Sequence, residues 1–210
     1  MPSETRAYDA IVFDLLTALL DSWSLWNAVA GSDADGLRWR RRYLELTYRC
    51  GTYRPYADIV REAAREAGLS PEMAAALIRR WGDLRPWPEA PAVLRELAAR
   101  VPLGVATNCS DALAAIAVAA AGEPFAAVAT AEAAGAYKPR PEPYRLVLAQ
   151  LGTDPSRTLF VAGSAADVPG AAGVGMPVFW HNRAGQPPVG EGGPQPLRTA
   201  GSLTPLLALV

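Results

Sequence analysis

The sequence predicts an α/β protein built on a doubly wound parallel sheet, with a helical cap inserted after the first strand. Three observations lead to this fold class. Short apolar runs recur along the chain, helical patterns lie between them, and residues 22–88 break this alternation because they contain helical patterns alone. Strands that alternate with helices pair in parallel, and the connecting helices then cover both faces of the sheet.

Five apolar runs have the character of buried strands. The first, Ala10–Phe13, ends at a carboxylate, Asp14. A short and uninterrupted apolar run is typical of a strand that is covered on both faces. We expect these runs to form the sheet of a Rossmann-like core, and the other four are residues 103–106, 126–129, 158–162 and 177–180.

Helical patterns fill the gaps between these runs. We expect helices at residues 91–100, 111–121 and 143–151, the last of which ends before Gly152, a residue that suits a left-handed helix cap. Residues 183–201 are rich in glycine and proline and predict a long surface loop. A short helix capped by Ser202 is expected to follow.

Residues 22–88 separate the first strand from the second and predict an inserted cap. Ser70-Pro71-Glu72 offers an N-cap followed by proline in the first helical turn. Apolar residues recur at helical spacing just before it, at Ile59, Val60, Ala63, Ala64 and Ala67. The predicted domains are therefore a core of residues 1–21 and 89–210 and a helical cap of residues 22–88.

Composition excludes several classes of partner. A formal net charge of -1 provides no basic field for nucleic acid or an anionic membrane. No apolar signal region opens the chain, and no stretch approaches the roughly 18 continuous apolar residues of a membrane span. Cys50, Cys109 and a single histidine cannot form a zinc site of the usual kind. We expect a cytoplasmic protein that binds a small molecule and no metal or cofactor, and we leave a homodimer open.

Polar residues follow four of the predicted strands. Asp14 ends the first, Thr107 and Asn108 end the second, Lys138 comes some residues after the third, and Asp167 follows the fourth. Because ligands of doubly wound sheets bind outside the carboxyl ends of the strands, we expect these side chains to share one crevice. Lys138 is the only lysine among 20 Lys and Arg residues, which indicates a position that needs a compact, titratable amine.

The motifs around these residues resemble the haloacid dehalogenase superfamily, and most closely its 2-haloacid dehalogenases. The resemblance spans nearly the whole chain, and the motifs occur in the family's order around a helical insertion. They are Phe13-Asp14-Leu15-Leu16, the segment Trp39–Glu45 with Arg40 in register with a halide-binding arginine, Thr107-Asn108-Cys109-Ser110, Tyr137-Lys138-Pro139 with Tyr144, and Trp180-His181-Asn182-Arg183.

The resemblance implies a haloacid dehalogenase-like core and a hydrolase of the EC 3.8.1.2 type, which removes halide from a short 2-halo carboxylic acid. In this scheme Asp14 attacks the carbon that carries the halogen, and water then hydrolyses the aspartyl ester. Lys138 keeps Asp14 ionised, and Asp167 anchors Lys138 and helps to activate the water.

The resemblance also implies a set of substrate-binding residues. Thr107 and Asn108 are expected to bind the substrate carboxylate and the departing halide, while Arg40 closes over the halide from the cap. The set is completed by Leu15, Tyr144 and Ser164, and an apolar wall is expected from Leu16, Trp39 and Tyr43.

A phosphatase of the same superfamily is the second interpretation. The first motif of such enzymes reads Asp-x-Asp, and its second carboxylate protonates the leaving group. Here Leu16 stands in the place of that second carboxylate. Gly163 stands where a magnesium-binding acid would be expected. Both departures favour displacement at carbon, which needs no metal.

A weakly active binding protein is the third interpretation, because the chain also departs from the dehalogenase pattern. Thr17 comes one place early and Ala18 follows it, so the direction of the Thr17 hydroxyl stays open. Ala162 and Ser164 stand where the dehalogenases have a serine and an asparagine. His181 and Cys109 are expected to be structural, since Cys109 has no histidine base beside it in the sequence.

Overall fold

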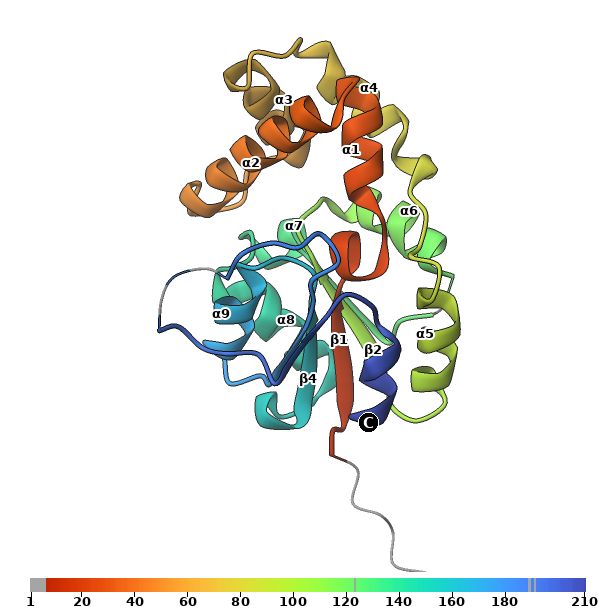
Figure 1. Ribbon diagram of the computed structural model, residues 1–210. Coiled ribbons are helices and arrows are strands. Elements are labelled where there is room, and N and C mark those ends of the chain that lie inside the picture. Colours follow the sequence, from red (N-terminus) through yellow and green to blue (C-terminus); the bar gives the residue numbers. More distant parts are fainter. Residues whose placement is uncertain (1–6, 123, 189, 191) are drawn as a thin grey trace, which may run out of the picture.

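The structure is a computed structural model that describes residues 7–122, 124–188, 190 and 192–210. Its centre is a parallel sheet whose described strands have the order β3-β2-β1-β4-β5-β6 (Figure 1). The chain leaves β1 toward one edge and later returns to fill the other, as in a doubly wound fold, which confirms the predicted class. The strands are β1 (Ala10–Asp14), β2 (Leu103–Thr107), β3 (Ala127–Thr130), β4 (Thr158–Ala162), β5 (Val178–His181) and β6 (Arg198–Ala200).

The register aligns the carboxyl ends of the central strands. Asp14 of β1 pairs with Ala106 of β2, and Phe13 pairs with Val161 of β4. Side chains alternate between the two faces along a strand. Ile11 and Phe13 therefore pack with α5 (Ala90–Ala98) and α6 (Asp111–Ala121) on one face, and Val12 packs with α8 (Pro141–Leu151) and α9 (Asp167–Ala172) on the other (Figure 1).

Two predictions for the last part of the chain are wrong. β6 lies inside the stretch predicted as a loop, and Leu197 N and Asn182 N donate to Val178 O and Ala200 O at 2.8 and 2.9 Å. This strand is short and largely exposed, so it has no apolar run that could reveal it. The chain then ends in a 3₁₀ helix, Thr204–Ala208, which follows Leu203 and receives no side-chain cap from Ser202.

The other predicted helices agree with the structure to within a few residues. The pattern at 111–121 is α6, and α5 and α8 begin slightly earlier than expected, which is the usual uncertainty at helix ends. α8 ends at Gly152, whose φ of 66° confirms the predicted left-handed cap. A further short helix, α7 (Ala131–Ala134), connects β3 to the segment that carries Lys138.

Residues 22–88 contain helices but none of the strands of the described sheet. In Figure 1 these helices stack beyond the carboxyl ends of the strands. They are α1 (Ser22–Ala30), α2 (Asp33–Arg49), α3 (Tyr56–Glu66), α4 (Glu72–Arg79) and the 3₁₀ turn Trp81–Asp83. The two connections to the sheet pair with each other, since Asp21 N donates to Arg85 O at 2.8 Å.

The predicted domain boundaries at residues 21 and 89 stay a prediction, and residues 1–6 of the predicted core lie outside the described residues. Within the described part of the chain, no helix is both long and apolar enough to cross a membrane.

Candidate active site

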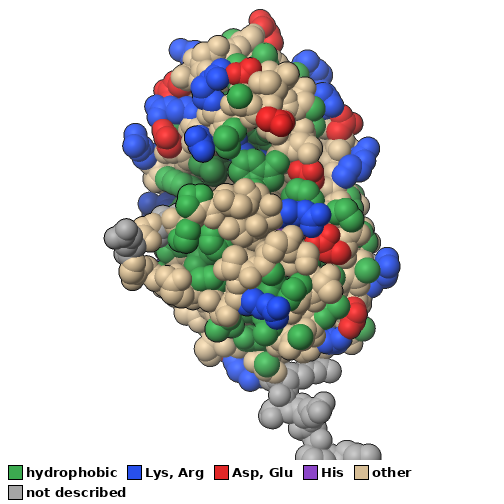
Figure 2. Space-filling model, in the orientation of Figure 1, with side chains coloured by type: hydrophobic (Ala, Val, Ile, Leu, Met, Phe, Trp, Pro, Cys, Tyr) green, Lys and Arg blue, Asp and Glu red, His purple; other side chains and the backbone are tan. Residues whose placement is uncertain are grey.

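A cavity of about 40 Å³ lies where the carboxyl ends of the strands face the inserted helices. Figure 2 shows hydrophobic side chains gathered along this boundary. We call the sheet side of the cavity the floor, and it consists of Asp14, Leu16, Thr17, Asn108, Lys138, Pro139, Ser164, Ala166 and Asp167. We call the opposite side the roof, and it consists of Ser22, Trp26, Arg40, Tyr43, Leu44, Tyr48 and Tyr56.

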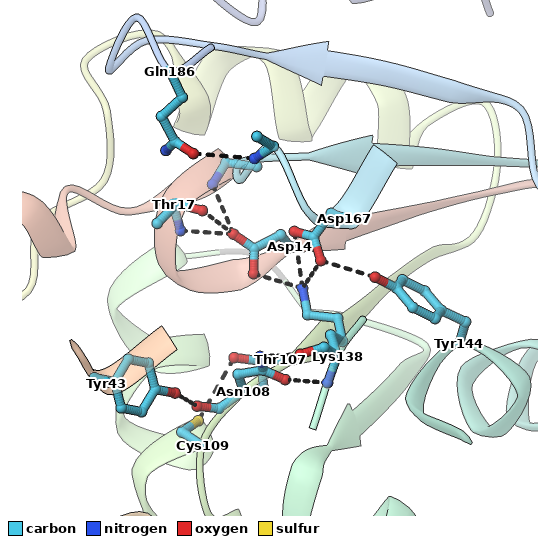
Figure 3. A network of polar contacts seen from close by, with 12 residues as sticks. Asp14, Thr17, Tyr43, Thr107, Asn108, Cys109, Lys138, Tyr144, Asp167 and Gln186 are labelled. Carbon is cyan, nitrogen blue, oxygen red and sulfur yellow. Dashed lines mark hydrogen bonds and ion pairs between the residues drawn. The ribbon is translucent and has the colours of Figure 1, made fainter. Parts of the chain in front are cut away.

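Asp14 lies at the end of β1, directly before a π-helical turn, Leu15–Leu19. This turn directs its donors at one oxygen of the carboxylate. Asp14 Oδ2 accepts from Thr17 N at 2.9 Å, from Ala18 N at 3.3 Å and from the Thr17 hydroxyl (Figure 3). Asp14 Oδ1 instead accepts from Lys138 Nζ at 2.8 Å. The two carboxylate oxygens therefore have different environments.

The direction of the Thr17 hydroxyl, which the sequence left open, is toward Asp14. Gly163 makes this position available, because a Cβ at residue 163 would overlap the Thr17 hydroxyl and Ala18 N. An acidic side chain at residue 163 is incompatible with this turn. The early threonine and the glycine are thus two parts of one local arrangement.

Lys138 lies between two carboxylates. Its Nζ is 2.8 Å from Asp14 Oδ1 and 3.1 Å from Asp167 Oδ1 (Figure 3). The Asn108 side chain fixes the backbone of Lys138, since Lys138 N donates to Asn108 Oδ1 at 2.7 Å and Asn108 Nδ2 donates to Lys138 O at 3.0 Å. Asp167 is held from behind by the Tyr144 hydroxyl, which donates to its Oδ1 at 2.9 Å.

The charges of the floor shift one another's pKa. Burial raises the pKa of Asp14, but the Lys138 ammonium and the hydrogen bonds from Lys138 and Thr17 outweigh burial, so the pKa lies below its usual value. Burial lowers the pKa of Lys138, but the charges of Asp14 and Asp167 have the larger effect, so the pKa lies above its usual value. Burial raises the pKa of Asp167, and Lys138 does not fully offset this. Asp14 is therefore the stronger acid of the two carboxyls.

Arg40 projects from α2 into the roof and is 8% exposed. Its Nη1 donates to Ser22 Oγ at 3.0 Å, and its guanidinium lies 3.9 Å from the ring centroid of Trp23. Among residues 7–210 as far as the structure describes them, no carboxylate lies within ion-pair distance of Arg40. A buried cation without a partner is unfavourable, so the roof is suited to an anion.

The structure brings together some of the predicted substrate-binding residues and not others. Arg40, Asn108 and Ser164 line the cavity. Leu15 is fully buried in the core because the π-helical turn begins with it. Thr107 is fully buried with its hydroxyl 3.6 Å from Cys109 Sγ. Tyr144 contacts Asp167 from outside the cavity wall, so Leu15, Thr107 and Tyr144 do not line the cavity.

Several roof residues were missed by the sequence analysis. Of the expected apolar wall, Leu16 and Tyr43 line the cavity, while the indole of Trp39 donates to Val60 O at 2.9 Å within the helical insertion. Tyr48 and Tyr56 line the cavity without having been expected. A signal was present, because four of the seven tyrosines lie between residues 43 and 56.

The remaining reactive groups occupy structural positions. Cys109 is buried, and burial raises the pKa of its thiol to about 12. His181 is buried beneath the π-helical turn with Nδ1 2.9 Å from Ala18 O. In the described part of the chain, no three His, Cys, Asp or Glu side chains are arranged to hold a metal ion. Asp14 and Asp167 both contact Lys138 instead.

Strand order, a carboxylate at the end of β1 and the helical insertion that follows it define a doubly wound α/β protein with helices inserted over the carboxyl ends of its strands. Residues 8–175 match the family of haloacid dehalogenase-like hydrolases. The match covers well over half of the chain, and the protein belongs to this family.

Individual relatives agree with this assignment. The (S)-2-haloacid dehalogenase of Xanthobacter autotrophicus is 32% identical over 185 residues, which cover 80% of this chain and 73% of the relative. The (S)-2-haloacid dehalogenase of Pseudomonas sp. (strain YL) is 31% identical over 193 residues, which cover 83% of each chain. Among solved structures, the L-2-haloacid dehalogenase RSc1362 superposes with a TM-score of 0.86 at 30% identity and covers 97% of this chain and 98% of its own.

Proposed function

We propose that this protein is an (S)-2-haloacid dehalogenase that removes halide from a short 2-halo carboxylic acid, with Asp14 as the nucleophile. The observation that carries the proposal is the asymmetric environment of Asp14. Oδ2 is held by the π-helical turn, while Oδ1 accepts only from the Lys138 ammonium among the described residues, and Asp14 lines the same cavity as Arg40. The names of the relatives support the same activity.

The first step is displacement at carbon. Asp14 Oδ1 forms a bond to C2 of the acid from the side opposite the halogen, and the carbon–halogen bond breaks as halide leaves with the bonding electrons. The configuration at C2 is inverted. A carboxylate is a weak nucleophile, but one that is desolvated, ionised and oriented toward the carbon can react. Lys138 keeps Asp14 ionised, and the donors on Oδ2 fix its orientation.

The second step is hydrolysis of the ester. Water attacks Cγ of Asp14 and gives one proton to Asp167. The bond from Cγ to Oδ1 then breaks, and the 2-hydroxy acid leaves with Oδ1, which takes that proton from Asp167. The water oxygen stays in the Asp14 carboxylate, and its second proton is released to solvent. Negative charge develops on Oδ2 during this attack. The N–H groups of Thr17 and Ala18 and the Thr17 hydroxyl already point at that atom, so they stabilise the charge without rearrangement.

Arg40 serves the leaving group and Ser164 the substrate carboxylate. A buried guanidinium without a carboxylate partner gains most when negative charge appears beside it, which happens as the halide departs. Ser164 lies on the floor near Asp167 and offers a hydroxyl. Asn108 acts indirectly, since both ends of its amide are bonded to the Lys138 backbone.

A single turnover in heavy-oxygen water tests the proposal. With enzyme in excess over (S)-2-chloropropionate, one labelled oxygen should enter the peptide that contains Asp14, because water attacks Cγ of the ester. Asp14→Asn is the matched control and should release no halide and carry no label. Label found in the hydroxy acid of that first turnover, with none in the peptide, would mean that water attacks the substrate directly.

A substrate screen separates this proposal from phosphatase chemistry. The purified protein is offered short 2-halo acids and phosphate esters, each with EDTA and with magnesium. Halide release that persists in EDTA is the expected result. Phosphate release that requires magnesium, without halide release, would overturn the proposal in favour of the phosphatase interpretation.

A further inference from the structure

Trp87 lies behind the π-helical turn, on the segment that returns from the inserted helices to the sheet. Its indole Nε1 donates to Thr17 O at 3.0 Å, and its backbone N donates to Leu19 O at 2.9 Å. The segment Leu15–Leu19 is thereby bonded at two points to a residue about 70 positions later in the chain. Trp87 lies outside the cavity wall, so any effect on chemistry must pass through the turn.

The carbonyl that Trp87 contacts belongs to the same peptide unit as a donor to Asp14. Thr17 C=O and Ala18 N–H are the two ends of one planar amide, and Ala18 N donates to Asp14 Oδ2 at 3.3 Å. The indole, the amide and the carboxylate therefore form one chain of hydrogen bonds. A donor at the carbonyl end of an amide polarises it and strengthens the bond that its N–H makes.

Neighbouring groups contact the Trp87 ring and the π-helical turn. The Arg183 guanidinium lies 4.6 Å from the Trp87 ring centroid, and Arg183 Nη1 is 2.8 Å from Glu89 Oε1. His181 Nδ1 lies 2.9 Å from Ala18 O, and since a carbonyl oxygen only accepts, Nδ1 carries the proton. The turn is thus held from behind by donors on its Thr17 and Ala18 carbonyls.

We propose that Trp87 is a positioning residue for ester hydrolysis, acting on Asp14 through the Thr17–Ala18 amide. This inference rests on the proposed function. When Asp14 attacks the substrate, charge leaves the carboxylate, so the donors on Oδ2 orient it but do not stabilise developing charge in that step. When water attacks the ester, charge returns to Oδ2, and a polarised Ala18 N–H stabilises it. Trp87 therefore favours the second step over the first.

The test compares Trp87→Phe with Trp81→Phe. Phenylalanine keeps an aromatic ring but loses the N–H, and Trp81 offers a matched loss because its Nε1 donates to Leu113 O at 2.9 Å, away from Asp14. Three quantities are measured for the wild type and both variants. They are the Ala18 amide proton shift by NMR, kcat and KM for (S)-2-chloropropionate, and the fraction of enzyme that carries the Asp14 ester in acid-quenched samples by peptide mass spectrometry.

In Trp87→Phe the Ala18 amide proton should move upfield, kcat should fall by about three- to tenfold, and the ester fraction at steady state should rise. Trp81→Phe should leave all three unchanged. An unmoved Ala18 resonance, or an equal fall of kcat in both variants with no rise of the ester, would overturn the role of Trp87. If the wild type releases no halide, the proposed function fails, while the Ala18 resonance still decides whether the hydrogen-bond chain exists.

Discussion

The floor and the roof of the cavity are built differently. On the floor, Lys138 contacts both Asp14 and Asp167, and the Tyr144 hydroxyl donates to Asp167. On the roof, Arg40 is also buried, but among the described residues its guanidinium bonds only a serine hydroxyl and lies over aromatic rings. The cation of the floor is in direct contact with carboxylates, whereas the cation of the roof has no carboxylate within ion-pair distance among the described residues and feels Asp14 only from farther away.

This difference assigns separate tasks to the two parts. A floor whose groups already bond one another is suited to reactions on a covalently attached substrate, because reorganisation is avoided when charge moves. A roof with an unpaired cation is suited to recognition and to the capture of a leaving anion. Substitutions in the two regions should therefore affect stability and activity in different proportions.

The largest effect is expected from Lys138→Met, which removes the cation that Asp14 and Asp167 share. It leaves two buried carboxylates without a cation, so the free energy of unfolding at pH 7 should fall by about 3–5 kcal/mol. Halide release should fall by about a thousandfold or more. Urea unfolding and initial rates measure both effects. Arg140→Met is the control, since it removes only the exposed pair with Glu142 and should change little.

The stability loss in Lys138→Met should also depend on pH. In the wild type the pKa of Asp14 is lowered, so its pairing stabilises the fold above the usual carboxyl pKa and is lost as pH falls. In the variant, burial without Lys138 raises the pKa of both carboxyls, so the folded state takes up protons at a higher pH than the unfolded state does. The difference in free energy of unfolding between variant and wild type should therefore be smaller at pH 5 than at pH 7. A constant gap would show that the carboxylates are not the source of the loss.

A smaller effect with the opposite balance is expected from Arg40→Met. Methionine keeps the apolar part of the side chain against Trp23 but removes the unpaired cation, so the free energy of unfolding should stay the same or rise. Halide release should fall by about a hundredfold in kcat, with little change in the affinity for the unhalogenated acid. Arg42→Met, on the exposed side of α2, is the control. If Arg40→Met lost as much stability as Lys138→Met, the Arg40 guanidinium would have to be stabilised by its surroundings even without a ligand.

The floor was largely predictable from the sequence, and the roof was not. Asp14, Lys138 and Asp167 follow strands, and the carboxyl ends of parallel strands meet at one edge, so their convergence follows from the fold class alone. Roof residues lie on helices, where small rotations decide which side chains reach a cavity. Arg40 was found only through its resemblance to a family motif, and Tyr48 and Tyr56 were missed.

Local geometry explains the remaining differences. Thr17 reaches Asp14 although it comes early in the motif, because the turn after Asp14 is π-helical and Gly163 leaves room for the hydroxyl. Neither feature is visible in a pattern of apolar and polar residues. Thr107 was expected at the substrate from its resemblance to a family motif, but alternation along β2 turns it toward Cys109 while Asn108 lines the cavity.

The smallest effect is expected at the contact that joins the two regions. The Tyr43 hydroxyl, on the roof, donates to Asn108 O on the floor at 2.9 Å. Tyr43→Phe removes this bond and should lower the free energy of unfolding by about 1 kcal/mol. Because Lys138 keeps its contacts with Asp14 and Asp167, and Arg40 keeps its bond to Ser22, kcat should change little. KM should rise about two- to threefold as the roof is held less firmly.

Tyr137→Phe is the matched control for this contact. The Tyr137 hydroxyl also joins the inserted helical segment to the sheet, since it donates to Arg54 O at 2.8 Å, but this bond lies away from the cavity. Its loss should lower stability by a similar amount and leave KM unchanged. If both variants raised KM equally, the bond at Tyr43 would act only through general stability, and the roof would not depend on Asn108 for its position over the floor.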